Sequence, residues 1–206
     1  MKKQLQLPKF WSSDQPRWNF GDALSVLVFS ELLVDFIPYK TRPWTIGSVL
    51  MDGAASLQRE RDNASLPSFI EGVDCQAVFW GCGVRGTQEV SEQFLDVIAV
   101  LSARGPCSAS ALRAGASLPL GDPGLFLPAL YQPRKVPELA GKSVCVPHYL
   151  DSRSDDEILS ASGCDKVLRV ALAPNRNAIY AFIDAATSAD FLLCGALHAA
   201  IIGAAY

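Results

Sequence analysis

The chain has 206 residues, of which half are hydrophobic and only 19% are charged, and its formal net charge at pH 7 is −3. A chain of this length can form one large domain or two small ones and bury roughly 70% of its unfolded surface. The low charge content excludes a disordered protein. The slightly acidic balance, without runs of Lys or Arg, argues against nucleic acid as a partner.

The N-terminal segment and the cysteines indicate a cytoplasmic protein. Residues 1–14, MKKQLQLPKFWSSD, lack the apolar core and the cleavage site of a secretory signal. The most apolar stretch, residues 191–206, is shorter than the about 20 residues of a spanning helix. The six cysteines form no C-x-x-C pair, and the two histidines add no zinc-ligand spacing. We expect no metal site and at most peripheral contact with the inner face of a membrane.

In the first two thirds of the chain, short apolar runs alternate with turn signals and helical periods, which is typical of an α/β protein with parallel strands. The predicted strands are 4–11 (QLQLPKFW), 45–50 (TIGSVL), 77–83 (AVFWGCG) and 96–104 (DVIAVLSAR). Helices are predicted at 23–34, from Pro106 to Gly115, and after the Asp122-Pro123 pair.

A proline-rich segment with mixed charges, 131–142, predicts a linker, and we place the domain boundary there, with domains at 1–135 and 136–206. Three β/α units follow it. Their predicted strands are 143–150, 166–172 and 190–195, and their predicted helices are 154–162, 175–188 and 196 onward. The first of these helices has a Ser-x-x-Glu capping box and a glycine stop. Because the sequence ends inside the last helix, we expect the second domain to be truncated.

Two motifs of the first domain bear on ligand binding. GCGVRG, residues 81–86, matches a dinucleotide-binding fingerprint, but the next strand ends in Arg104 where an acidic residue should hold the ribose. NAD is therefore not expected, although the glycine turn can still approach a ligand. Arg104 stands just before a helix start, where an Arg fork binds carboxylate or phosphate; a plain surface Arg is the alternative.

Two acidic turns leave two interpretations open. In NFGD, residues 19–22, Asp22 either caps the following helix or belongs to a ligand-binding turn at the end of a strand. Asp122 precedes Pro123, so a helix cap with Pro at its first position is the default.

Both histidines follow strands of the second domain. His148 ends the strand 143–150, and His198 lies in the first turn of the last helix, among alanines. A lone His of this kind packs in the core or contacts a ligand at the edge of the sheet, and the sequence favours neither.

Taken in order, the motifs resemble a known family. They are Asn-x-Gly-Asp, Ile-Gly-Ser-Val-Leu, Trp-Gly-x-Gly, Ala-Arg-Gly-Pro, Gly-Asp-Pro-Gly-Leu, Pro-His and a late Leu-His, between about residues 19 and 206. Together they resemble the polysaccharide pyruvyl transferases, in particular the ketal pyruvyl transferases of the xanthan type.

The resemblance implies two Rossmann-like domains that face each other across a cleft, as in GT-B glycosyltransferases. It implies phosphoenolpyruvate as the donor, a lipid-linked or polymeric sugar as the acceptor, and no cofactor. Family members continue past the Leu-His helix, which again predicts a truncated second domain. They usually carry Ser or Arg before Leu-His and often Gly after it, whereas this chain has Gly195, Ala196 and Ala199.

On this reading, His198 is the first candidate for proton transfer or phosphate contact, and His148 is the second. Asp22 is the candidate that accepts a proton from the acceptor sugar. Substrate-binding roles are expected for Arg104, for the weaker candidate Arg85, and for Asn19, Gly21, Gly83, Asp122 and Leu197. Two alternatives remain, a GT-B-type glycosyltransferase that uses a nucleotide sugar and an inactive truncated remnant.

Overall fold

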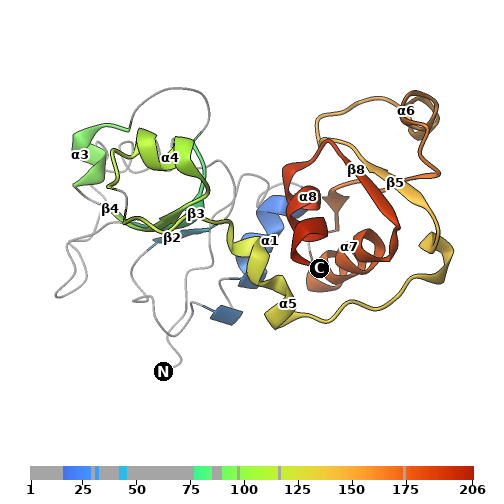
Figure 1. Cartoon of the computed structure of the whole chain (residues 1–206), viewed down its shortest axis with the longest axis horizontal. Helices are drawn as coiled ribbons and strands as arrows, with labels where there is room; N and C mark the ends of the chain where they lie inside the picture. The colour runs from blue at the N-terminus through green and yellow to red at the C-terminus, as the bar shows by residue number, and fades with distance from the viewer. Residues whose placement is uncertain are drawn as a thin grey trace. The chain divides into compact units, whose positions relative to one another are not determined.

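The computed structural model describes residues 16–28, 31–32, 42–45, 77–84, 90–96, 98–115, 117–173 and 175–206. These residues form a mixed α/β fold with small parallel sheets (Figure 1). They group into two compact units, unit 1 within residues 25–123 and unit 2 with residues 16–24 and 124–206. This grouping places 124–135 in unit 2, and the domain boundary expected after residue 135 stays a prediction. None of the described helices is long and apolar enough to cross a bilayer.

Unit 1 is built on a parallel sheet in the order β2-β3-β4, with strands β2 (Arg42–Thr45), β3 (Ala77–Cys82) and β4 (Ile98–Ala103). The predicted strands 77–83 and 96–104 are confirmed with shorter bounds. Of the predicted strand 45–50, only the first residue is described, and the predicted strand 4–11 lies outside the described residues.

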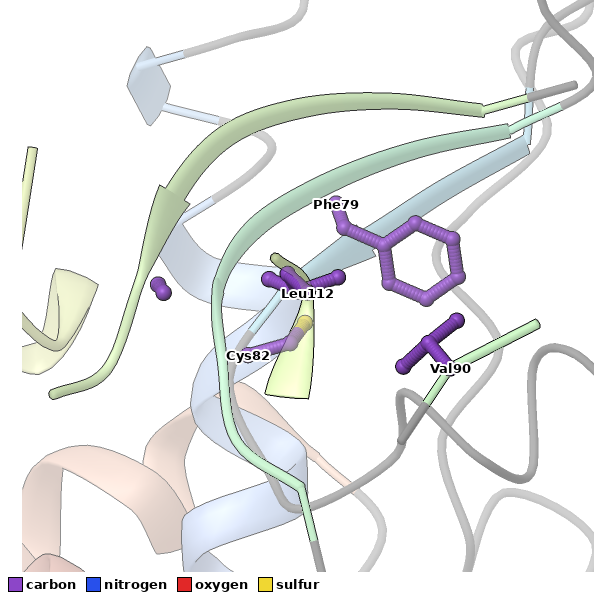
Figure 2. Packing of buried hydrophobic residues seen from close by; sticks show 5 residues of the cluster. Phe79, Cys82, Val90 and Leu112 are labelled. Carbon is purple, nitrogen blue, oxygen red and sulfur yellow. The ribbon is translucent and has the colours of Figure 1, made fainter. Parts of the chain in front are cut away.

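The buried cluster of unit 1 comes from β3, β4 and the segments around the short helices α3 (Glu92–Leu95) and α4 (Pro106–Ala111). Figure 2 shows Phe79 and Val90 turned toward each other inside this cluster. Pro106 begins α4 as predicted, but the helix ends at Ala111 rather than at Gly115. Arg113 adopts a left-handed backbone (φ 51°) there, which ends the helical turn early.

Unit 2 has a second parallel sheet, in which β5 (Ser143–Val146) lies between β6 (Lys166–Val167) and β8 (Phe191–Cys194). The predicted strand 166–172 is split, because its two ends pair with different partners. β6 pairs parallel with β5, whereas β7 (Ala171–Leu172) pairs antiparallel with β1 (Trp18–Asn19).

The capping box and the glycine stop predicted for the helix 154–162 are both confirmed, and the other two predicted helices of unit 2 are present. Ser154 and Glu157 form the capping box of α6 (Asp155–Ser162), and Gly163 ends it with φ 68°. Asn175 caps α7 (Arg176–Ser188) by accepting a hydrogen bond from the Ala178 N–H, and α8 (Leu197–Ala205) is the last helix.

The helix α1 (Phe20–Val28) begins in unit 2, where its first residue is fixed by α7. The Phe20 ring stacks on Phe182 with a centroid distance of 3.9 Å, and its N–H donates to the Val170 carbonyl at 2.8 Å. Further along the chain, Pro123 opens the 3₁₀ helix η2 (Pro123–Phe126), which continues as α5 (Leu127–Leu130), as the Asp-Pro pair predicts.

The 131–142 segment, expected as a linker, runs along α7 and is bonded to it. The Tyr131 hydroxyl and the Arg134 N–H both donate to the Asp184 carboxylate at 2.8 Å, and the Val136 N–H donates to the Ser188 hydroxyl at 2.8 Å. The segment contains the short 3₁₀ helix η3 (Pro137–Leu139). Its prolines therefore stiffen a segment that belongs to unit 2.

Candidate functional site

The loop after β5 and the turn between β8 and α8 meet at the first turn of α8. The N–H groups of Gly195 and Ala196 both donate to the Val146 carbonyl, at 2.8 and 3.2 Å, which fixes this turn against the end of β5. A Cβ on Gly195 would lie 3.1 Å from the backbone nitrogen of His148, a contact tighter than most real Cβ atoms make. The glycine therefore lets His148 and the start of α8 lie side by side.

The first turn of α1 also reaches α8. A Cβ on Gly21 would lie 2.1 Å from Nδ1 and 2.6 Å from Cγ of His198, so only glycine leaves room for this ring. The structure thus brings together two candidates, Gly21 and His198, that lie at opposite ends of the sequence. His198 is half-buried in this position, and Leu197 before it is 51% exposed.

The NFGD turn differs from its interpretation in two respects. The capping side chain is that of Asn19, whose Oδ1 accepts a hydrogen bond from the Asp22 N–H at 3.3 Å. Asp22 itself lies in the first helical turn. The strand before the turn, β1, is antiparallel to β7, so the turn does not follow a strand of a parallel sheet. What brings the turn to α8 is the contact of Gly21 with His198.

The N-terminus of α8 has the electrostatics of an anion-binding end. Its cap residue, Ala196, supplies no side-chain hydrogen bond, and the first turn carries no acidic residue. The backbone N–H groups of a first helical turn lack intrahelical partners, and the helix dipole adds partial positive charge there. An anionic group would be stabilised at this position.

His148 is exposed at the end of β5, and its ring is held by its own loop. Nδ1 accepts a hydrogen bond from the Leu150 N–H at 3.3 Å, and the ring lies at 4.6 Å from the Tyr149 ring. Because Nδ1 acts as the acceptor, the neutral imidazole carries its proton on Nε2. His148 can therefore offer an N–H donor to a ligand oxygen.

In unit 1, Arg104 and Asp122 form a buried ion pair. The Arg104 Nε donates to Asp122 Oδ2 at 3.0 Å, and the two side chains are only 16% and 4% exposed. The backbone N–H of Arg104 donates to the Cys82 carbonyl at 3.1 Å, which places the arginine at the carboxyl ends of β3 and β4. Asp122 thus forms an ion pair, and the helix cap that was its default interpretation stays a prediction.

The glycine motif of unit 1 is explained in part by packing. Gly81 has φ 66°, and a Cβ there would lie 2.0 Å from the Pro123 Cδ, so the residue allows β3 to pass close to the Asp122-Pro123 turn. Gly83 is buried, and Arg85 lies outside the described residues. Burial raises the pKa of the Cys82 thiol to about 12, which keeps it protonated and unreactive.

The candidates therefore form one group in each unit. Unit 2 holds Asn19, Gly21, Asp22, His148, Leu197 and His198, and unit 1 holds Gly83, Arg104 and Asp122. The roles assigned to them stay predictions. In the described part of the chain, no three His, Cys, Asp or Glu side chains gather in the way that a metal ion needs.

Sequence reasoning missed one residue beside this group, Arg169. It lies between β6 and β7, and its guanidinium bonds to the loop that follows His148. In the sequence it stands inside the apolar run KVLRVAL, where an isolated Arg carries no signal.

A cavity of about 520 Å³ opens elsewhere in unit 2, and it does not coincide with the candidate site. It is lined by the ends of α7 and α8 and by β8, with Asp190 and Tyr206 among its few polar residues. None of the predicted site residues lines it. We place more weight on the converging candidates at the start of α8 than on cavity size, because these residues carry the chemistry.

No protein-family model, curated protein or solved structure matches this chain.

Proposed function

We propose that this chain is a pyruvyl transferase that moves pyruvate from phosphoenolpyruvate onto a sugar of an exopolysaccharide repeat unit, as a cyclic ketal. The observation that carries the proposal is the arrangement at the start of α8. The side-chain-free Gly21 makes room for the His198 ring, and His148 lies on the neighbouring loop beside Gly195. An imidazole in the first turn of a positively polarised helix, with a second histidine on the neighbouring loop, suits a substrate that is anionic and must be protonated.

The reaction needs a proton donor, an anion site and a base. A proton added to the methylene carbon of phosphoenolpyruvate gives an oxocarbenium-like centre, which one sugar hydroxyl attacks. Phosphate then leaves with its bonding electron pair, and a second hydroxyl of the same sugar closes the ring. The two hydroxyls release two protons, which balance the proton on carbon and the proton on the departing phosphate.

In this proposal His198 supplies the proton or contacts the phosphate, and His148 donates a hydrogen bond from Nε2. Asp22, in the first turn of α1, accepts a proton from the acceptor. The Leu197 N–H, at the start of α8, donates to an anionic oxygen of the substrate.

In the proposal, Arg104 of unit 1 binds a carboxylate or phosphate of the substrate. The proposal includes the finer fold prediction, in which the chain consists of two Rossmann-like domains of the GT-B-like class. The small parallel sheet in each unit is compatible with such domains. Asp122 neutralises part of the Arg104 charge, so the guanidinium would orient a carboxylate or phosphate as well as attract it. Arg85 would assist, and the enzyme would meet its lipid-linked or polymeric acceptor on the cytoplasmic side of the membrane.

The test is phosphate release from phosphoenolpyruvate in the presence of a panel of exopolysaccharide oligosaccharides and lipid-linked sugars. We expect acceptor-dependent release that His198→Ala reduces by at least about 100-fold, with a smaller loss for His148→Gln. Gly115→Ala is the matched control, because a Cβ there meets nothing within 4 Å.

Binding measurements separate the alternatives. If nucleoside diphosphate sugars raise the melting temperature and phosphoenolpyruvate does not, the chain is a glycosyltransferase and the proposal is wrong. If neither donor binds, the chain is a non-catalytic remnant, which the apolar Ala196 and Ala199 around Leu-His would then explain.

A further inference from the structure

The Arg169 guanidinium bonds to three successive acceptors of one loop. Nε donates to the Asp155 carboxylate at 2.8 Å, Nη1 donates to the Asp151 carbonyl at 3.0 Å, and Nη2 donates to the Arg153 carbonyl at 2.6 Å. Nη2 also pairs with Asp155 at 2.7 Å. The acceptors lie between the end of β5 and the first turn of α6, so a single side chain holds the second half of the β5–α6 loop, from Asp151 to Asp155.

Asp151 is the point where this loop is held from two sides. Arg169 binds its carbonyl, whereas Arg153 binds its carboxylate through Nε and Nη2, at 3.0 and 2.6 Å. The Asp151 N–H in turn donates to the His148 carbonyl at 2.9 Å, which closes a turn over residues 148–151. The position of Asp151 therefore sets the geometry of the turn that begins at His148.

Inside this turn the His148 ring is fixed by two contacts. The Leu150 N–H donates to Nδ1 at 3.3 Å, and the Tyr149 ring packs against the imidazole. If the turn opened, the Leu150 N–H would move away and the ring would become a solvated histidine with both tautomers populated.

We propose that Arg169 is a positioning residue for His148, because it clamps the β5–α6 loop and so keeps the ring as an Nε2–H donor on the loop whose backbone packs against Gly195. The functional part of this inference, that His148 then donates to the substrate, rests on the proposed function. Arginine is required in the clamp, since a lysine ammonium has no fork and cannot span two carbonyls and a carboxylate with fixed geometry.

The clamp is tested first without any substrate, by NMR of the imidazole nitrogens. The chain has two histidines, and a His198→Gln background leaves only the signals of His148. With Arg169 present, we expect the pattern of the Nε2–H tautomer and a Leu150 N–H that exchanges slowly. Arg169→Ala and Arg169→Lys should both shift the ring nitrogens toward a mixture of tautomers and speed the Leu150 exchange by about tenfold or more.

Arg134→Ala is the matched control, because it also removes one positive charge from the surface of unit 2. The bond of Arg134 to Asp184 on α7 comes from its backbone N–H, which the substitution keeps. The substitution should leave the His148 pattern unchanged. Where Arg169→Ala fails to fold, Arg169→Lys gives the answer, since it keeps the charge and most of the side-chain volume. A folded Arg169→Lys with the unaltered tautomer pattern and unaltered Leu150 exchange overturns the clamp.

Kinetics then test the link to function. In an active chain, Arg169→Lys should lower kcat for phosphate release by about 10- to 100-fold, with KM for phosphoenolpyruvate changed much less. An altered tautomer with unchanged kcat overturns the positioning role. If the unsubstituted chain releases no phosphate, the proposed function fails, but the NMR result still decides whether Arg169 holds His148.

Discussion

The contact between Gly21 and His198 gives the sharpest prediction, because one added methyl group tests it. In Gly21→Ala the new Cβ would lie 2.1 Å from Nδ1, 2.6 Å from Cγ and 2.9 Å from Cε1 of the imidazole. Carbon and nitrogen atoms in contact are normally about 3.5 Å apart. Cγ is only two bonds from the backbone Cα of His198, so a side-chain rotation alone does not remove it from the new methyl group. The imidazole and the helix backbone must therefore move away from residue 21 by about 1 Å.

Two opposing effects set the size of the change. Alanine in a helix is favoured over glycine by about 0.5–1 kcal/mol, whereas overpacking costs about 1–3 kcal/mol. We expect the clash to dominate, with a net loss of about 1–2 kcal/mol in the free energy of unfolding. For a chain of this size the loss lowers the melting temperature by about 2–8 °C.

A double-mutant cycle separates the clash from other effects. Thermal and urea unfolding are measured for Gly21→Ala, His198→Ala and the double variant, with Gly115→Ala as the control. In the His198→Ala background the imidazole is absent, and the added methyl group fits into the volume that the ring occupied. Gly21→Ala should therefore become neutral or slightly stabilising in that background. We expect a coupling free energy of about 1–3 kcal/mol. A Gly21→Ala chain that melts normally, with no coupling to His198, would refute the packing contact.

Three further predictions concern unit 1. Asp122→Asn should destabilise by about 3–5 kcal/mol in urea unfolding, because it leaves the Arg104 charge buried, and replacing both residues with apolar ones should cost less. Gly81→Ala should lower the free energy of unfolding by about 2–4 kcal/mol, through its positive φ and the adjacent proline ring, whereas Gly105→Ala, which meets nothing within 4 Å, should not. The pKa of the Cys82 thiol is raised from 9.0 to about 12, so the thiol stays protonated to a higher pH in the folded chain than in the unfolded one. Stability should therefore fall as the pH rises from about 9 toward 12, and Cys82→Ala should reduce that slope.

Local signals predicted the local structure well. The Ser154–Glu157 capping box and the Gly163 stop lie within a few residues of the helix ends that they define, so the sequence contains the whole interaction. The apolar runs of β3 and β4 were equally readable, because parallel strands are buried on both faces.

What the sequence could not provide was the choice among distant partners. The run 166–172 has strand character throughout, but its two halves pair with β5 and with β1, and no local pattern marks the division. The Gly21–His198 contact joins the two ends of unit 2, and it depends on Phe20 stacking on Phe182. The role of Arg169 could not be predicted for the same reason, since two of its three partners are loop carbonyls that any residue type provides.

The bonding of the 131–142 segment along α7 has a consequence for proteolysis. Its composition, with two prolines, one arginine and two lysines, is that of a segment that trypsin would cut. However, the Arg134 N–H is bonded to Asp184, and the Lys135 ammonium donates to the Thr187 carbonyl at 3.3 Å, so neither residue can enter a protease cleft while α7 is in place. Cleavage there would report how often unit 2 opens, rather than how mobile a surface loop is.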